Sequence, residues 1–245
     1  ADRMLDMGFQ ESLDNIIAET PAQRQTLLFS ATYPEEIQSI ARRVMIKPVM
    51  AQVESTHDDS TIEQHFYKVE DDEHRQIALR LLLQHLKPES ALVFCNTKRE
   101  SQELANDLRS HRFSALALHG DLEQRDRDRA LVRFSNKSVS VLVATDVAAR
   151  GLDIDSLDAV FNYHLARDSE VHVHRIGRTG RAGSQGIACS LYSEKEAFRI
   201  PMLEEYLSLV VSNENLPPQR LLEKPVYKPP MDTIQIDGGK KQKIR

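Results

Sequence analysis

Apolar runs alternate with amphipathic stretches along most of the chain. From residue 62 onward, six runs are predicted strands: IEQHFYKV, ALVFCN, SALALHG, VSVLVAT, DAVFNYH and GIACSLYS. Helical spacing of apolar positions predicts helices over 74–86, 100–111, 123–135 and 194–207, with a short helical stretch after DAVFNYH. Strands that are continuously apolar are typical of a parallel sheet covered on both faces. We therefore predict an α/β fold over residues 62–212, a doubly wound parallel sheet with helices on both faces.

The flanking segments differ from this regular pattern. Residues 22–53 are predicted to contain a strand (QTLLFSA, 25–31), a helix (34–45) and a strand (VMAQV, 49–53), which form part of another α/β layer. The polar segment 54–61 and the proline-rich segment 213–230 are predicted linkers. Residues 231–245 begin like a strand and end basic, and the chain opens on ADRMLDMGF without a methionine. We expect a piece of a longer protein, with a further folded unit beginning at 231.

Composition excludes several classes of protein. The 245 residues are 40% hydrophobic and 28% charged, as in globular proteins. No apolar run approaches the ~20 residues that span a bilayer, and the first residues lack a signal-peptide pattern, so we expect a cytoplasmic protein and no membrane partner. Cys95 and Cys189 lie in apolar runs and are predicted to be buried free thiols. Because the net charge is −5, a polyanion must bind a local patch.

Residues that suit phosphate binding follow three predicted strands, where ligands of parallel sheets gather. Thr97 is predicted to form a capping box with Glu100, and Asp121 to cap the helix that follows a turn at Gly120. Other candidates at this edge are Gln124, Arg127, Thr145, Asp146, Arg150, Gly151 and Asp153. Hydroxyls, glycines, helix starts and arginines therefore converge on one edge of the sheet.

The segment VHRIGRTGRAG repeats arginine and glycine every third residue, with arginines at 175, 178 and 181. Arginine offers a planar charged fork to phosphate oxygens, and glycine permits close backbone approach, so the segment is a predicted phosphate-binding site. Simpler interpretations stay open. The arginines could be a solvated helix end, and Thr97 and Asp121 could be caps only. Arginines 125, 127 and 129 could form surface ion pairs with aspartates 126 and 128, and His119 and His174 could be structural.

The same motifs, in order and spacing, resemble those of DEAD-box RNA helicases. They are SAT (30–32), LVFCNT (92–97), HGDLEQRDR (119–127), ATDVAARGLD (144–153) and HRIGRTGR (174–181). The resemblance implies that 1–53 are the end of a first RecA-like, ATP-binding domain and that 62–212 are the second RecA-like domain. Asp2 would be the end of the DEAD motif, so the chain itself would hold no metal. Residues 231–245 resemble the start of the RRM-like domain of the DbpA subgroup, whose members recognise large-subunit ribosomal RNA.

The resemblance also implies an activity, which is ATP hydrolysis coupled to local unwinding of RNA duplexes, in large ribosomal subunit assembly. Arg178 and Arg181 would be arginine fingers at the γ-phosphate of ATP, Asp153 and Gly151 would contact the nucleotide, and His174 would link the ATP and RNA sites. Ser30 and Thr32 would couple hydrolysis to domain closure. RNA would be held by Thr97, Gly120, Gln124, Arg127, Thr145 and Arg150. His164 and His172 depart from the usual family pattern.

ATP and Mg²⁺ would be bound mainly by an upstream domain, because the chain contains no GxxxxGK[ST] sequence. The chain alone is therefore expected to be inactive, with RNA and the protein's own first RecA-like domain as partners. Two alternatives stay open: a non-enzymatic RNA- or protein-binding module, and a DNA-translocating helicase of related fold.

Overall fold

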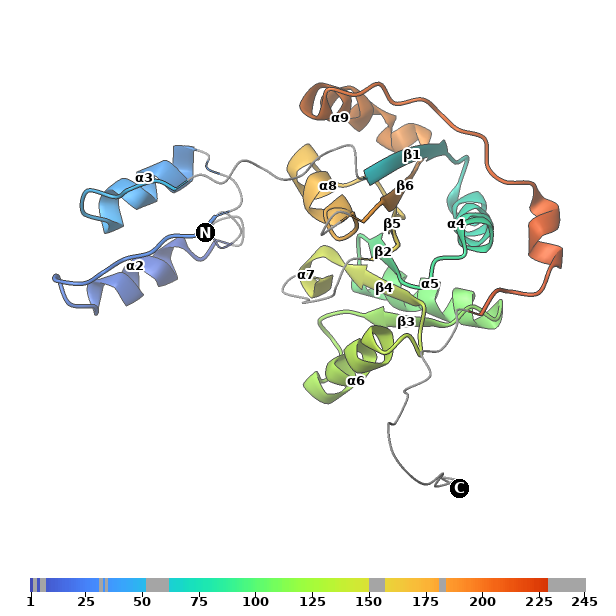
Figure 1. The fold of residues 1–245 in the computed structure, drawn as a ribbon, viewed down its shortest axis with the longest axis horizontal. Helices are drawn as coiled ribbons and strands as arrows, with labels where there is room; N and C mark the ends of the chain where they lie inside the picture. The colour runs from blue at the N-terminus through green and yellow to red at the C-terminus, as the bar shows by residue number, and fades with distance from the viewer. Residues whose placement is uncertain are drawn as a thin grey trace. The chain divides into compact units, whose positions relative to one another are not determined.

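The computed structural model describes residues 1, 4, 8–30, 33, 35–51, 62–149, 157–180 and 184–228 (Figure 1). The chain divides into two compact units, Ala1–Thr56 and His57–Arg245. The predicted linker 213–230 is described as far as residue 228, whereas residues 52–61 and 229–245 lie outside the described part of the chain.

The first unit contains the helices α2 (Gln10–Ala18) and α3 (Glu35–Val44). Helix α3 confirms the helix predicted over 34–45, and its residues Ile37, Ile40 and Ala41 are buried at helical spacing. The strands predicted over 25–31 and 49–53 are wrong for the residues described there, 25–30 and 49–51, which form no strand. A strand needs a neighbour for its backbone hydrogen bonds, and the described part of this unit offers none.

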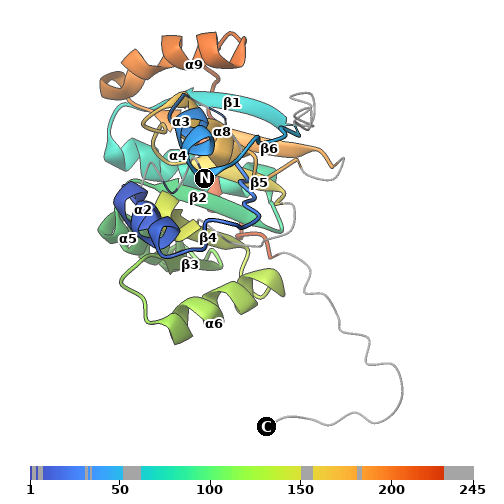
Figure 2. The same cartoon turned by 90° about the vertical axis from the view of Figure 1, so that its left-hand side faces the viewer.

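The second unit is a six-stranded sheet in the order β1-β6-β5-β2-β4-β3, with every neighbouring pair parallel (Figure 2). The strands are β1 (Ile62–Lys68), β2 (Ala91–Cys95), β3 (Ala115–Leu118), β4 (Val141–Thr145), β5 (Ala159–Asn162) and β6 (Gly186–Tyr192). All six predicted strands are confirmed. The strands β2, β4 and β5 are buried along their whole length, which explains why their sequences are apolar without alternation.

Helices cover both faces of this sheet (Figure 1). One core packs α4 (Asp72–Leu86) and α5 (Lys98–Ser110) against the sheet. The opposite core packs α6 (Gln124–Ser135) and the short α7 (Asp146–Ala149). Alternate residues of β2 enter the two cores, Val93 the first and Leu92 the second. Among the described helices, none combines the length and apolar content that crossing a bilayer requires.

One predicted helix of the second half needs correction. The helix predicted over 194–207 is split into a 3-10 helix, η2 (Glu194–Arg199), and α9 (Ile200–Leu207). Pro201 lies at the start of α9, where its missing N–H costs nothing, whereas inside a longer helix it would remove a hydrogen bond. The segment predicted as a linker, 213–230, contains a 3-10 helix, η3 (Gln219–Glu223), and its residue Tyr227 packs against the core that holds α4.

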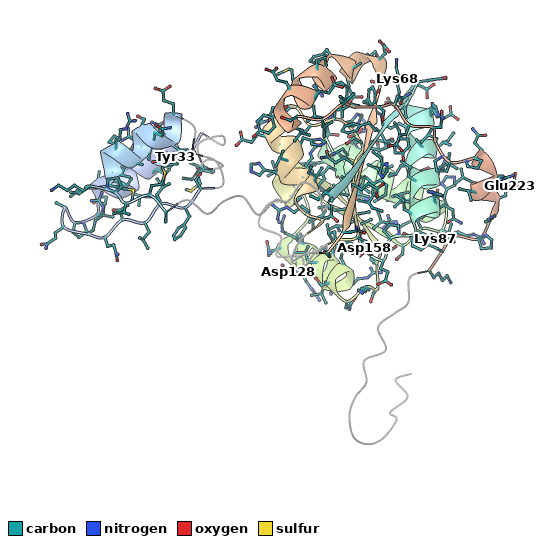
Figure 3. The ribbon with its side chains drawn as sticks, turned by 45° about the horizontal axis from the view of Figure 1, so that its top comes forward. Tyr33, Lys68, Lys87, Asp128, Asp158 and Glu223 are labelled. Carbon is teal, nitrogen blue, oxygen red and sulfur yellow. The ribbon has the colours of Figure 1, made fainter. Side chains whose placement is uncertain are left out.

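Local contacts fix the connection that leads into β2 (Figure 3). Helix α4 ends at Leu86, and the next residue, Lys87, adopts the left-handed conformation with a φ of 50°. The Asp158 carboxylate then accepts hydrogen bonds from the backbone amides of Glu89, at 2.7 Å, and Ser90, at 3.1 Å. The first residue of β2 therefore starts next to the first residue of β5. The predicted buried thiols are also confirmed, because Cys95 and Cys189 are free and buried, and burial raises the pKa of each thiol.

Candidate functional site

Three loops that carry candidate phosphate ligands meet at one edge of the sheet. Strand β4 lies between β2 and β3, and its last residue, Thr145, is opposite Cys95, the last residue of β2. Because these strands are parallel, the loops that follow them share the same edge. The structure therefore brings together Thr97, Gly120 and Thr145.

Thr97 begins α5 in a modified capping arrangement. Its hydroxyl oxygen accepts a hydrogen bond from the backbone N–H of Glu100, at 3.1 Å, as predicted. The Glu100 carboxylate accepts from the N–H of Asn96, at 3.0 Å, and not from Thr97 as a full capping box requires. In the described part of the chain, no acceptor takes the Thr97 hydroxyl hydrogen, so this group can still donate to a phosphate oxygen.

The loop after β3 is held to α5 by an ion pair. The prediction that Asp121 caps α6 is wrong: the capping position is Glu123, and Asp121 accepts a hydrogen bond from Lys98 Nζ at 2.5 Å. This bond lowers the pKa of Asp121. A methyl group on Gly120 would lie 3.5 Å from Lys98 Cε, an ordinary contact, and the φ of Gly120 is not in the left-handed region. Packing within this unit therefore does not require glycine here, whereas close approach by a ligand would.

Helix α6 presents Gln124 and Arg127 near its N-terminus. Gln124 is exposed and donates from Nε2 to the Asp128 carboxylate at 2.7 Å. Arg127 donates from Nη2 to the carbonyl oxygen of Ala148 in α7, at 2.9 Å. A guanidinium has five N–H groups, so this single bond to a carbonyl leaves capacity to bind phosphate oxygens.

Thr145 organises the short helix α7. Its hydroxyl oxygen accepts from the N–H of Ala148 at 3.3 Å, and the side chain is buried. Arg127 and Thr145 therefore both contact Ala148, which joins α6 and the end of β4 into one small structural group. Contact of Thr145 with a ligand would be limited to the hydroxyl, since the rest of the side chain is covered.

Arg175 does not belong to a phosphate-binding site. Its side chain is 2% exposed, and it donates from Nε and Nη2 to the two carboxylate oxygens of Asp146 at 2.7 and 2.9 Å. Nη1 donates to the carbonyl oxygen of His164, at 2.9 Å, and to Asn162 Oδ1, at 3.3 Å. The guanidinium also lies 5.1 Å from the centre of the Phe94 ring. The first arginine of the repeat is thus a buried structural residue, so the predicted phosphate-binding role of the segment does not extend to Arg175.

Arg178 lies just beyond the end of α8 (Ser169–Ile176), in a turn that the sheet holds in place. The Thr179 hydroxyl donates to the carbonyl oxygen of Leu157, and the same two residues form a parallel β-bridge. Gly180 has a φ of 64°, which favours glycine. A side chain at Gly186, the start of β6, would overlap Thr179. These contacts fix the backbone on both sides of Arg178, whose side chain is partly exposed.

The two groups of candidates therefore lie at opposite ends of β5. Leu157, which binds the Arg178 segment, precedes β5, whereas the loops with Thr97 and Thr145 lie at the carboxyl ends of the strands. Helix α8 runs between them, and the pair of Arg175 with Asp146 ties α8 to the residue after Thr145. His174 lies on α8, partly buried, and its Nδ1 is buried without a hydrogen-bond partner among the described residues.

His164, one of the two departures from the family pattern, bridges two carboxylates. Its Nε2 lies 2.5 Å from Glu100 and its Nδ1 lies 3.3 Å from Glu196, which also accepts from Arg75 Nη2 at 2.5 Å. Burial opposes the charged form of this histidine, but the hydrogen bonds to Glu100 and Glu196 outweigh burial and raise its pKa. Burial also disfavours ionised Glu100 and Glu196, yet hydrogen bonds from His164 and from backbone amides hold the pKa of both carboxyls low. The charged network thus supports the loop that begins at Asn96.

His172, the other departure, is a neutral core residue. It is 1% exposed, stacks on Phe66 with ring centres 6.1 Å apart, and its Nε2 lies 3.0 Å from Gln64 Oε1. Burial, and then the charge of Arg175, lower its pKa to about 3. His172 therefore stays uncharged near neutrality and contributes packing.

The remaining predicted residues fall elsewhere. Ser30 lies in the first unit, partly exposed and outside any helix or strand. Six further predicted residues lie outside the described residues: Asp2, Thr32, Arg150, Gly151, Asp153 and Arg181. Across the described ranges, no group of three or more histidine, cysteine, aspartate or glutamate side chains could hold a metal ion.

A parallel sheet covered on both faces, with candidate ligands at its strand ends, is a doubly wound α/β domain, and its likeness to solved DEAD-box helicases makes it RecA-like. The family model of the helicase conserved C-terminal domain matches residues 73–183, and the DEAD/DEAH box helicase model matches residues 1–40. The chain belongs to the family of DEAD-box RNA helicases.

Individual relatives agree with this assignment. The chain is 50% identical over 245 residues to the ATP-dependent RNA helicase DbpA of Escherichia coli strain K12, and it covers 53% of that protein. It resembles the structure of S. cerevisiae Dbp5 bound to RNA and ADP BeF3, with 28% identity, a TM-score of 0.76, and coverage of 86% of this chain and 57% of that one. It also resembles the structure of E. coli SrmB bound to RraA, with 35% identity, a TM-score of 0.60, and coverage of 63% of this chain and 91% of that one. The chain thus spans about half the length of its DbpA relative.

Proposed function

We propose that this chain acts within an ATP-dependent RNA helicase that couples ATP hydrolysis to local unwinding of RNA duplexes. In this proposal the strand-end loops hold the RNA backbone through Thr97, Gly120, Gln124, Arg127, Thr145 and Arg150. The observation that supports it most directly is the arrangement of these loops on one edge, tied through the pair of Arg175 and Asp146 to the helix that precedes Arg178.

Arg178 and Arg181 would reach the γ-phosphate of ATP, where an arginine finger contributes roughly 10³ to 10⁵ in rate. Asp153 and Gly151 would contact the nucleotide, and His174 would connect the two ends of α8. ATP and the magnesium ion that accompanies it would be bound mainly by an upstream domain, because the chain contains no GxxxxGK[ST] sequence. Ser30 and Thr32 would couple hydrolysis to closure of the two units.

Target choice would come from outside the strand-end loops, because contacts to phosphates and sugars carry no sequence information. Because residues 231–245 resemble the DbpA subgroup, the target in this proposal is large-subunit ribosomal RNA and the setting is ribosome assembly in the cytoplasm.

The test is an Arg178→Ala substitution in a helicase that combines this chain with a complete ATP-binding domain. RNA-stimulated kcat should fall by about 10³ or more, while RNA affinity stays within about twofold. Arg167→Ala is a matched control, since Arg167 is 65% exposed and pairs only with Asp168 in the described structure. Loss of RNA affinity with normal turnover would instead make Arg178 an RNA contact.

The same assay separates the alternatives. A non-enzymatic RNA- or protein-binding module would bind without any RNA-stimulated hydrolysis, and a DNA-translocating helicase would be stimulated by DNA as strongly as by RNA. The 245-residue chain by itself should show no turnover, because it contains no GxxxxGK[ST] sequence.

A further inference from the structure

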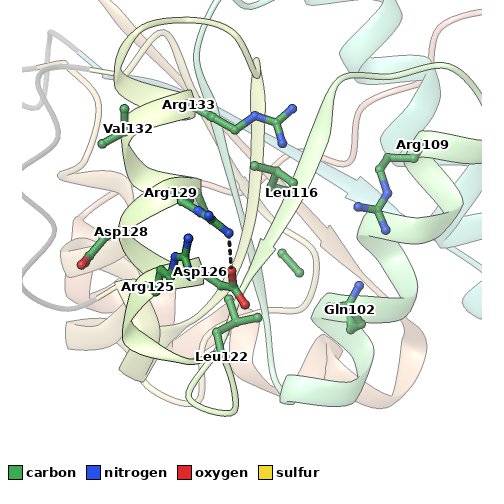
Figure 4. Close-up of a pocket in the computed structure, with 12 residues that line it drawn as sticks. Gln102, Arg109, Leu116, Leu122, Arg125, Asp126, Asp128, Arg129, Val132 and Arg133 are labelled. Carbon is green, nitrogen blue, oxygen red and sulfur yellow. Dashed lines mark hydrogen bonds and ion pairs between the residues drawn. The ribbon is translucent and has the colours of Figure 1, made fainter.

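A groove of about 980 Å³ lies at the outer edge of the sheet, and one end of it reaches Leu122 in the loop after β3 (Figure 4). It runs along β3, which is the last strand of the sheet and pairs with β4 alone among the described strands. Helix α5 packs on one face of the sheet and α6 on the other, so the groove lies between these two helices. Its floor is apolar and includes Leu116 and Ala117 of β3.

Four arginines line this groove, which we call the arginine groove: Arg109, Arg125, Arg129 and Arg133. All four are exposed. Figure 4 shows the three from α6 pointing from the helix toward β3, and Arg109 pointing toward them from α5. The α6 arginines recur every fourth residue, so a rise of about 1.5 Å per residue spaces them about 6 Å apart along one helix face.

Two aspartates, Asp126 and Asp128, also line the groove, so the four arginines leave it with a net formal charge of +2. Asp126 lies 3.4 Å from Arg129, but both side chains are more than half exposed, and such pairs contribute little. This is the one ion pair among residues 125–129 in the described structure, so the alternative interpretation of these residues as a face of surface ion pairs has little support. The Asp128 carboxylate accepts a hydrogen bond from Gln124 Nε2 at 2.7 Å, and it makes no ion pair with an arginine of the groove in the described structure.

We propose that the arginine groove binds the sugar–phosphate backbone of an RNA segment that continues from the candidate RNA site at the start of α6. The inference rests on the proposed function, because that site contains Gln124 and Arg127. One cation per helical turn suits a repeating anion, and arginine suits phosphate oxygens. An acidic peptide added to β3 is the weaker fit, because the strand offers only the four residues Ala115–Leu118 for backbone pairing.

The test compares RNA length and salt dependence for a triple variant, Arg125→Gln, Arg129→Gln and Arg133→Gln. These positions are exposed and glutamine is a good helix former, so the variant should fold. Affinities for a short and a long oligouridylate are measured by fluorescence anisotropy at several salt concentrations. Three lost single-strand phosphate contacts should reduce the slope of log K against log [salt] by about 2 and weaken long-RNA binding roughly tenfold at low salt. Binding of the short RNA should not change.

A charge-matched control removes three positive charges elsewhere, one on η2, one on η3 and one just after η3: Lys195→Gln, Arg220→Gln and Lys224→Gln. This control should retain the wild-type salt slope. Unchanged long-RNA affinity and slope in the groove variant, or an equal loss in the control, would overturn the inference. Loss of binding to an oligoglutamate peptide with normal RNA binding would also overturn it, and would reassign the groove to an acidic protein partner.

A second variant keeps this inference separable from the proposed function. Gln124→Ala combined with Arg127→Gln should weaken binding of the short and the long RNA alike. If that variant binds both RNAs normally, the proposed RNA site on the strand-end loops is wrong, whatever the groove variant shows. If it weakens both while the groove variant changes nothing, the groove inference alone fails.

Discussion

Replacing Arg175 with methionine should destabilise the second unit by about 4 kcal/mol. The substitution removes both bonds to Asp146 and leaves a carboxylate without its partner, which costs about 3–5 kcal/mol for a buried pair. The Asp146 side chain is 27% exposed and can regain some water, so the lower part of that range applies. Asn162 is fully buried, and losing a donor to its Oδ1 adds about 1 kcal/mol or more. The total is a large part of a typical stability of about 5–15 kcal/mol.

Urea unfolding followed by circular dichroism measures this loss. With an m value of about 2 kcal/mol per molar urea, the midpoint should fall by about 2 M. Arg99→Met is the matched control, because Arg99 is 87% exposed and makes a 2.7 Å pair with Glu103 on the same helix. Such a pair contributes about 0.3–0.5 kcal/mol, so the control midpoint should move by only about 0.2 M.

A midpoint shift for Arg175→Met no larger than that of Arg99→Met would refute the reasoning. A double-mutant cycle sharpens the test. Asp146→Asn should also destabilise, because it leaves the Arg175 charge buried without a counterion, and the double variant should lose less than the sum of the single variants. Additive losses would show that the two side chains are not coupled, despite the 2.7 Å separation.

Three further predictions concern single positions. His172→Phe should make the free energy of unfolding less sensitive to acid. The wild type loses about 2 kcal/mol of this free energy at pH 5, because its folded His172 pKa is about 3, whereas the unfolded histidine pKa is about 6.5. Equal changes in urea midpoint between pH 7.5 and pH 5 in both proteins would contradict this. His164→Gln should lower the free energy of unfolding more at pH 6 than at pH 9. The hydrogen bonds to Glu100 and Glu196 raise the His164 pKa, and the stability that they add is lost as pH rises through this pKa. A loss of stability that does not depend on pH would show that the charge of His164 is irrelevant. Gly120→Ala should leave the urea midpoint unchanged and weaken RNA binding about tenfold, or about 1.4 kcal/mol; unchanged RNA affinity would show that no ligand approaches this position.

The sequence predicted the sheet of the second unit well because burial on both faces removes alternation from its strands. It also predicted that Thr97, Gly120 and Thr145 share an edge, since parallel strands end together. Predictions failed where the outcome depended on distant partners. The apolar run 25–31 has the composition of a strand, but a strand forms only beside another strand. Aspartate is a residue type that often caps the N-terminus of a helix, but the Asp121 carboxylate is bound by Lys98, which lies 23 residues earlier.

The arginine repeat shows the same limit, and also a signal that could have resolved it. Arginines 175 and 178 look equivalent in a three-residue repeat, yet α8 ends at Ile176, so only the first is inside the helix. Position 175 lies four residues after Val171 and therefore on the same helix face, which is the buried one. A charge on a buried face needs a carboxylate partner. Asp146, the residue directly after an apolar strand, was such a carboxylate at the same edge. Helical periodicity, applied to the repeat, would thus have separated the structural arginine from the candidate finger at Arg178.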